Sequence, residues 1–180
     1  MKSRNGATDA YTTRHSDFID EVLVKCPLCG GMAVVKTPGY PQQDREVYED
    51  QVRFGCYHCG KAMRLRDKPQ TLLFTNSQGK PVVVRMLQGE NSRTDPFFGF
   101  DLWLVQSCLE DEIWAYNEAH LQFLEEFIAE PLRSRPQQPA YQHNKSIGSR
   151  LPRWMTSAKN RDKVLRVMQV LRQRLKSPLR

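Results

Sequence analysis

Two short stretches of this 180-residue sequence decide its fold: CPLCG at Cys26–Gly30 and CYHCG at Cys56–Gly60. Each holds two cysteines separated by two residues, and 26 residues lie between the pairs. Two such turns bring together four thiolates, which is the ligand set of closed tetrahedral zinc sites. A glycine follows each pair, where a positive φ lets backbone N–H groups point at sulfur. We therefore predict one structural Zn²⁺ held by Cys26, Cys29, Cys56 and Cys59.

Other interpretations of the cysteines remain open. A rubredoxin-type site uses the same two turns to hold iron for electron transfer, and the ligands alone do not separate the two metals. Redox-active CxxC pairs would need a thioredoxin-like βαβ context, whereas the flanking residues here are typical of hairpins. His58 lies inside the second turn and is expected at the surface or behind the ligands, because four cysteines already fill a tetrahedral site.

Alternating apolar residues around and after the turns predict antiparallel strands. The expected strands are Val22–Val24, Met32–Lys36, Val47 to Phe54, Met63–Leu65, Thr71–Phe74, Pro81–Leu87, Asp101–Cys108 and Glu112–Tyr116. Large aromatic residues cluster near the last two strands, and we expect them, with Cys108, to be buried.

Two helices are expected in the C-terminal part. Asn117 is a good N-cap for an acidic amphipathic helix over Glu118–Ala129, which Pro131 would end. Thr156 or Ser157 is expected to cap a basic helix. Its apolar residues repeat at helical spacing: Val164, Met168, Leu171 and Leu175.

The elements together predict an α+β fold. An N-terminal four-cysteine zinc ribbon continues into an antiparallel β-sheet and is followed by two C-terminal helices. The predicted division is a disordered N-terminus (1–17), a body with the zinc ribbon, sheet and acidic helix (18–131), a linker or strap (132–150) and a basic C-terminal helix (151–180).

Charge is unevenly distributed along the chain. Residues 132–180 hold 13 Lys and Arg against one acid, whereas residues 1–131 hold 14 bases and 19 acids. Such a basic cluster favours binding to polyanions, because phosphate contacts release counterions. The candidate nucleic-acid-binding residues are Arg153, Lys159, Arg161, Lys163, Arg166, Arg172, Arg174 and Lys176. The alternative is that this helix docks on the acidic helix of its own chain.

Other classes of function find little support in the sequence. The tripeptide His143-Asn144-Lys145 would suit an HNH-type nuclease, but no His–His or Asp–His strand motif precedes it. HExxH, GxSxG and Walker A sequences do not occur. No apolar stretch approaches the length of a membrane span, and the first residues lack a secretory signal. We expect a cytoplasmic protein without a small-molecule substrate.

The motifs CPLCG, CYHCG, DPFFGFDLWL, EIWAYNEAHLQFLEEF and RLPRWMTSAKNR together resemble bacterial proteins that contain a transcription-factor-IIB-type zinc ribbon, over about Val22 to Lys176. The resemblance implies zinc at the four cysteines and no particular activity. We expect a non-catalytic binding protein, associated with DNA or RNA through its basic end. The alternative is an adaptor that docks on an acidic partner protein.

Overall fold

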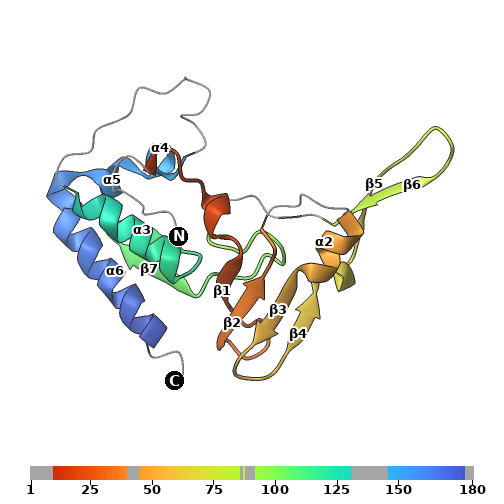
Figure 1. Ribbon diagram of the computed structural model, residues 1–180, viewed down its shortest axis with the longest axis horizontal. Coiled ribbons are helices and arrows are strands. Elements are labelled where there is room, and N and C mark those ends of the chain that lie inside the picture. Colours follow the sequence, from red (N-terminus) through yellow and green to blue (C-terminus); the bar gives the residue numbers. More distant parts are fainter. Residues whose placement is uncertain (1–9, 40–44, 86, 88–91, 131–145, 177–180) are drawn as a thin grey trace. The chain divides into compact units, whose positions relative to one another are not determined.

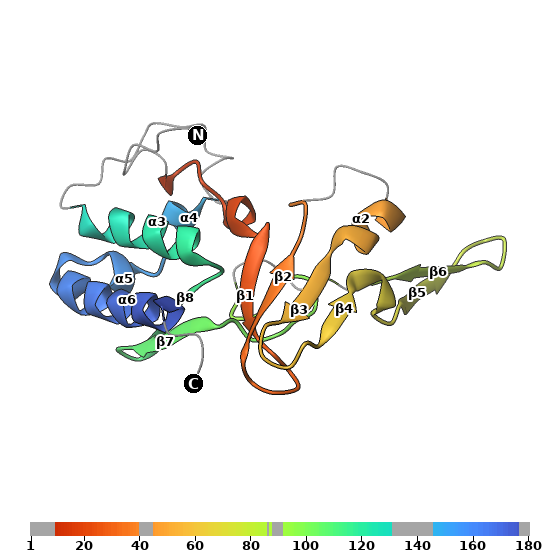
Figure 2. The ribbon, with the colours of Figure 1, turned by 60° about the horizontal axis from the view of Figure 1, so that its bottom comes forward.

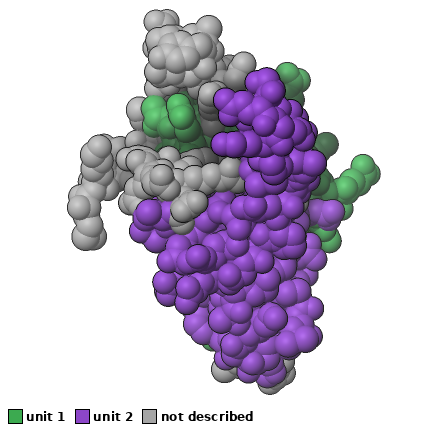
Figure 3. Space-filling view, turned by 90° about the vertical axis from the view of Figure 1, so that its right-hand side faces the viewer, with its two compact units in different colours: residues 1–19, 104–180 green, residues 20–103 purple. Residues whose placement is uncertain are grey.

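The computed structural model describes residues 10–39, 45–85, 87, 92–130 and 146–176 as a mixture of helices and antiparallel sheets (Figures 1 and 2). The chain divides into two compact units, coloured separately in Figure 3. One comprises residues 20–103, and the other comprises residues 1–19 with residues 104–180. The predicted body of residues 18–131 therefore contributes to both units.

The unit of residues 20–103 is built on a four-stranded antiparallel sheet whose spatial order follows the sequence (Figure 1). Its strands are β1 (Glu21–Lys25), β2 (Met32–Lys36), β3 (Arg53–Cys56) and β4 (Ala62–Arg64). Val22, Val35 and Phe54 are direct neighbours across three strands and are all buried. Such cross-strand apolar pairs stabilise a sheet, which explains why these residues form strands.

A helix, α2 (Arg45–Gln51), replaces the strand expected from Val47 onward. Tyr48 and Val52 lie four residues apart, so a helix carries both side chains to one side, and both are buried. A short 3₁₀ helix, η2 (Leu65–Asp67), follows β4.

The strands after η2 do not extend the four-stranded sheet. β5 (Thr71–Thr75) and β6 (Pro81–Val84) form a separate two-stranded sheet, with a register irregularity between Leu72 and Phe74. β7 (Leu104–Cys108) and β8 (Asp111–Ala115) form another, which belongs to the second unit. The predicted extension of the ribbon into an antiparallel sheet is therefore seen in part: the later strands are antiparallel but pair in two separate sheets, because alternation predicts strands and not their partners.

In the second unit, α3 (Glu118–Ala129) and α6 (Arg161–Lys176) pack against each other and near β7 and β8. Asn117 caps α3 as predicted, since its side-chain oxygen accepts a hydrogen bond of 2.9 Å from His120 N. Of the predicted apolar stripe on α6, Val164, Met168 and Leu171 are buried. Leu175 is partly exposed.

Helix α6 begins later than predicted. Residues 147–160 instead form three short helices, α4 (Ile147–Arg150), α5 (Arg153–Thr156) and η3 (Ala158–Asn160). Ser157 precedes η3 and makes no side-chain cap, while the side chain of Asn160 donates a hydrogen bond to Trp154 O at 2.9 Å. Residues 131–145, most of the predicted linker, lie outside the described residues.

The N-terminal segment differs from the predicted disorder wherever it is described. His15–Phe18 form a 3₁₀ helix, η1, and Ala10 and His15 are buried. Ile147 N donates to Thr13 O at 2.8 Å, and Asn117 donates to Phe18 O at 2.8 Å. Polar residues without periodicity give no local signal of such order, because it depends on contacts with distant parts of the chain. Residues 1–9 lie outside the described part.

Candidate metal centre

The two cysteine turns have matching backbone geometry. Gly30 N donates a hydrogen bond to Cys26 O at 2.9 Å, and Gly60 N donates to Cys56 O at 3.2 Å. Both glycines have φ of 71°, a conformation that other residues adopt at a cost. Because Ala33 on β2 pairs directly with Cys56 on β3, the two turns lie at the same end of the sheet.

The four sulfur atoms form one compact group, all within 4.8 Å of one another. Between the turns, Cys26 Sγ lies 3.7 Å from Cys59 Sγ, and Cys29 Sγ lies 3.6 Å from Cys56 Sγ. Four thiolates bound to Zn²⁺ at about 2.3 Å would be about 3.8 Å apart at the corners of a tetrahedron. The four cysteines named from the sequence therefore form a group that could hold one metal ion.

Burial and hydrogen bonding follow the same pattern in both turns. The first cysteine of each pair, Cys26 or Cys56, is buried, and the second, Cys29 or Cys59, is exposed. Leu28 N lies 3.4 Å from Cys26 Sγ, and His58 N lies 3.4 Å from Cys56 Sγ. Backbone N–H groups that donate to sulfur stabilise thiolate over thiol, which suits metal ligation.

The crowding of the thiols makes their protonation uneven. Burial disfavours the Cys56 thiolate, but N–H groups of Cys59 and His58 and the neighbouring thiols outweigh burial and lower the pKa of Cys56 to about 6. At Cys29 the Gly31 N–H lowers the pKa, yet partial desolvation and the three other thiols raise it to about 12. Four thiolates so close together would repel one another, and a bound metal ion would compensate their negative charge.

His58 lies outside the sulfur group and is exposed, as expected. Its Cβ packs close to the first turn: a Cβ built on Gly31 would lie 3.0 Å from it. Gly31 therefore permits the close approach of the two turns. Cys108, in the other unit, is buried, as the sequence predicted.

Three of the eight candidate nucleic-acid-binding residues contact parts of the chain outside α6, and a fourth, Arg166, donates to Asp162 O within α6 at 3.2 Å. Arg161 donates to Ile128 O at 3.1 Å and to Glu130 O at 3.3 Å. Arg172 pairs with Glu125. Arg174 donates to the backbone oxygen of Val105 at 2.8 Å and to the side chain of Gln106 at 2.9 Å. The basic helix is thus docked on α3 and β7.

The other five candidates are exposed: Arg153, Lys159, Lys163, Arg166 and Lys176. Trp154 lies near some of them, but its indole N–H donates to Asp111 at 3.2 Å. Glu110 and Asp111 line the same cleft as Trp154 and Lys159. Carboxylates at this position would repel phosphate, so the cleft is poorly suited to nucleic acid.

Sequence reasoning missed a set of basic residues on the sheet, namely Lys36, Arg53 and Arg64, which the strand register brings side by side. These residues are far apart along the chain, and only the pairing of β2, β3 and β4 brings them together. The tripeptide His143-Asn144-Lys145, considered for a nuclease, lies outside the described residues.

No family model, no curated protein and no solved structure matches this chain. Among the residues that the structure describes, no helix combines the length and apolar character needed to cross a membrane.

Proposed function

We propose that this chain is a non-catalytic, zinc-stabilised module that binds another protein. Cys26, Cys29, Cys56 and Cys59 would hold Zn²⁺, and four thiolates leave no coordination position for a substrate. The ion would serve to lock the two turns together. In small zinc domains such binding contributes about 10 kcal/mol or more to folding.

The exposed apolar surface of the β5–β6 hairpin carries the proposal. Every residue of β5 is exposed, and Leu72, Leu73 and Phe74 show 57%, 53% and 57% of their surface. On β6, Val83 is 36% exposed. Two-stranded hairpins are marginally stable alone in water, and contiguous exposed apolar side chains mark interaction surfaces. A partner protein that covers the hairpin would explain both features.

The test is capture of partners by full-length, zinc-loaded protein from a nuclease-treated lysate. We compare the wild type with Leu72→Thr/Phe74→Thr, which keeps strand-forming residues but removes apolar surface. Val170→Thr is the matched control, because Val170 is 46% exposed on α6 in the other unit. A partner should bind the wild type and V170T but not the hairpin variant. If no protein is retained, or if retention ignores the hairpin, the proposal is wrong.

Nucleic-acid binding through α6 and the segment before it is the second candidate. It is favoured by the exposure of Arg153, Lys159, Lys163 and Arg166. It predicts binding to single-stranded or duplex oligonucleotides at about 50 mM salt, and a steep loss of affinity as salt is raised. Lys163→Gln/Arg166→Gln should weaken such binding. Absence of binding at low salt removes this candidate.

A further inference from the structure

A row of basic side chains crosses the four-stranded sheet. Lys36 on β2 pairs directly with Arg53 on β3, and Arg53 pairs directly with Arg64 on β4. Directly paired residues point to the same face of a sheet. Glu21 on β1 is the next residue in this row and lies 3.8 Å from Lys36. We call Lys36, Arg53 and Arg64 the basic row.

The basic row is electrostatically unfavourable by itself. Like charges directly opposite each other in neighbouring strands destabilise a sheet. Asp50 on α2 lies 3.4 Å from Arg64 and 3.0 Å from Arg66 on η2. The hydrogen bond from Arg66, with the charges of Arg66, Arg64 and Arg53, lowers the pKa of Asp50 despite partial desolvation. Asp50 thus faces three guanidinium groups, which leaves an excess of positive charge on this surface.

The face that carries the basic row is open toward β3 and β4. Gly55 and Ala62 pair directly and lie on the same face as Arg53 and Arg64, because each is two residues away from the arginine of its own strand. A Cβ built on Gly55 would meet nothing within 4 Å, and Ala62 is exposed. The main chain of another molecule could therefore approach the sheet closely here.

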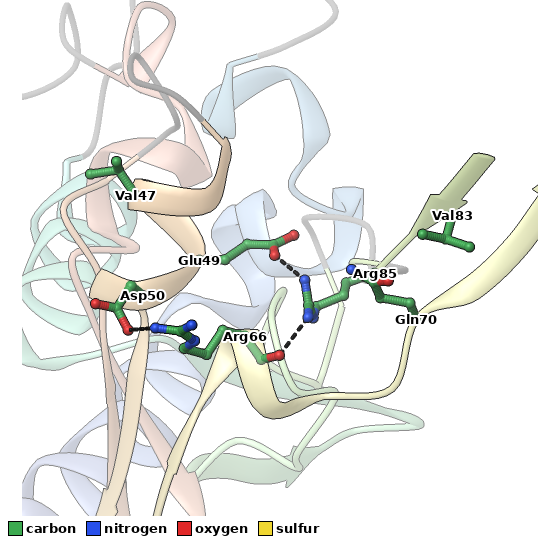
Figure 4. Close-up of a pocket in the computed structure, with 7 residues that line it drawn as sticks. All are labelled: Val47, Glu49, Asp50, Arg66, Gln70, Val83 and Arg85. Carbon is green, nitrogen blue, oxygen red and sulfur yellow. Dashed lines mark hydrogen bonds and ion pairs between the residues drawn. The ribbon is translucent and has the colours of Figure 1, made fainter. Parts of the chain in front are cut away.

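The basic row adjoins a cleft of about 580 Å³ through Asp50, which contacts Arg64 (Figure 4). Asp50 and Arg66 lie on one side of this cleft, and Val83 of β6 lies on the hairpin side. Val47 of α2 also lines the cleft and is 49% exposed. The basic row, this cleft with its two acids and two bases, and the exposed aliphatic side chains of α2 and β6 thus adjoin one another on the surface of this unit.

We propose that this surface binds an extended segment of a partner protein in which acidic and aliphatic side chains are interleaved. The inference rests on the proposed protein-binding function and names its site and the chemistry of the partner. Acidic side chains would neutralise the basic row, and aliphatic ones would cover Leu72 and Val83, which pair directly across the hairpin. Nucleic acid fits less well, since it has no aliphatic groups to cover the exposed leucine and valine side chains of the hairpin.

The test uses displayed peptides of about twelve residues, long enough for an extended strand, selected against full-length zinc-loaded protein. Enriched peptides should combine Asp or Glu with Leu, Ile or Val. Their affinity should fall about tenfold or more with Arg53→Glu and with Leu72→Thr/Phe74→Thr, and should weaken as salt is raised. Lys163→Gln/Arg166→Gln, which removes two exposed charges from the other unit, should bind like the wild type.

Arg53→Glu separates lost binding from lost folding. It places an acid between Lys36 and Arg64, so the variant should unfold at the same or a higher temperature than the wild type. The inference is overturned if no acidic–aliphatic peptide is enriched, or if enriched peptides bind Arg53→Glu normally. It is also overturned if oligonucleotides, and not peptides, bind in a manner that depends on Arg53. A lysate partner that needs the hairpin but not Arg53 would sustain the proposed function while refuting this inference.

Discussion

Glu125 on α3 and Arg172 on α6 form an ion pair in which Arg172 Nε lies 3.1 Å and 3.3 Å from the two carboxylate oxygens. Glu118 contributes a second carboxylate, 3.6 Å from the same guanidinium. The hydrogen bond to Glu125 and the charges of nearby acids raise the pKa of Arg172. Part of the positive charge of α6 is therefore balanced by acidic side chains of α3 in the same unit.

Removing the arginine of this pair should destabilise the unit. Arg172→Met should lower the free energy of unfolding by about 1–2 kcal/mol, because Glu125, whose side chain is only 19% exposed, loses its charged partner. Urea denaturation followed by tryptophan fluorescence measures the change. Lys163→Met, on the exposed face of the same helix, is the control and should shift stability by less than about 0.5 kcal/mol. Equal losses in both variants would contradict the assigned contact.

The buried histidines should make the second unit sensitive to acid. Burial, assisted by the charge of Arg150, lowers the pKa of His15 from 6.5 to about 4, and burial with the charge of His15 lowers that of His120. A lowered pKa in the folded state means that the unfolded state binds protons more readily. Stability is therefore present above about pH 6.5 and falls as pH decreases toward 4.

His15 alone should account for about 3 kcal/mol of this loss, since each unit of pKa difference corresponds to 1.36 kcal/mol. His15→Phe preserves an aromatic ring beside Trp114, where the two ring centroids are 5.4 Å apart. Denaturant unfolding between pH 7.5 and pH 4.5 should show a shallower pH dependence for this variant. An unchanged slope would mean that His15 is accessible to protons in the folded state.

Arg85 ties the base of the hairpin to α2 and η2. Its guanidinium pairs with Glu49 and donates to the backbone oxygen of Arg66 (Figure 4). It also donates to the backbone oxygen of Lys68 at 2.9 Å. Its side chain is only 13% exposed and that of Glu49 only 8%. Arg85→Met should cost about 3 kcal/mol, because the buried carboxylate of Glu49 loses its ion pair with Arg85. Arg85→Met/Glu49→Gln should recover part of the loss, and failure to do so would show that the pair is not coupled.

The basic row should reduce the stability of the sheet that carries it. Arg53→Glu replaces two repulsive cross-strand pairs with two attractive ones. These two gains outweigh the lost attraction to Asp50, which is the weakest contribution to the lowered pKa of Asp50, so the free energy of unfolding should rise by about 0.5 kcal/mol. Thermal unfolding at low and high salt measures the effect, which should shrink at high salt because exposed charges are screened. If the variant is less stable than the wild type at low salt, the net electrostatic interaction of Arg53 in the folded wild type is attractive and the prediction is wrong.

Structural elements that depend only on residues close by in the sequence could be predicted from the sequence alone. The cysteine turns follow from ligand spacing and glycine, and α3 follows from Asn117 and its apolar periodicity. In contrast, the burial of His15 among Trp114, Tyr116 and His120 depends on residues about a hundred positions away. Helix α2 was likewise not predicted. Valine favours strands, and only the burial of side chains in the folded protein shows that this segment is helical.

The sequence was sufficient to predict the four cysteines of the candidate metal centre, but not the charged surfaces elsewhere in the fold. Spacing alone selected the four cysteines, because a closed thiolate site needs no information beyond two turns. The basic row required the register of β2, β3 and β4, and the docking of α6 required the position of Glu125. Charge along a sequence records how many bases exist, but not which of them are neutralised in the fold.

Elemental analysis of purified protein, combined with substitution of Cys29, an exposed member of the four-cysteine group, tests the central claim most directly. We predict one zinc and no iron per chain in a colourless protein, loss of the zinc in Cys29→Ser, and unfolding of residues 20–103 when a chelator is added. Cys108→Ser is the control and should retain its zinc. A chain that contains no stoichiometric metal, or that keeps its fold and metal content after Cys29→Ser, would contradict the account.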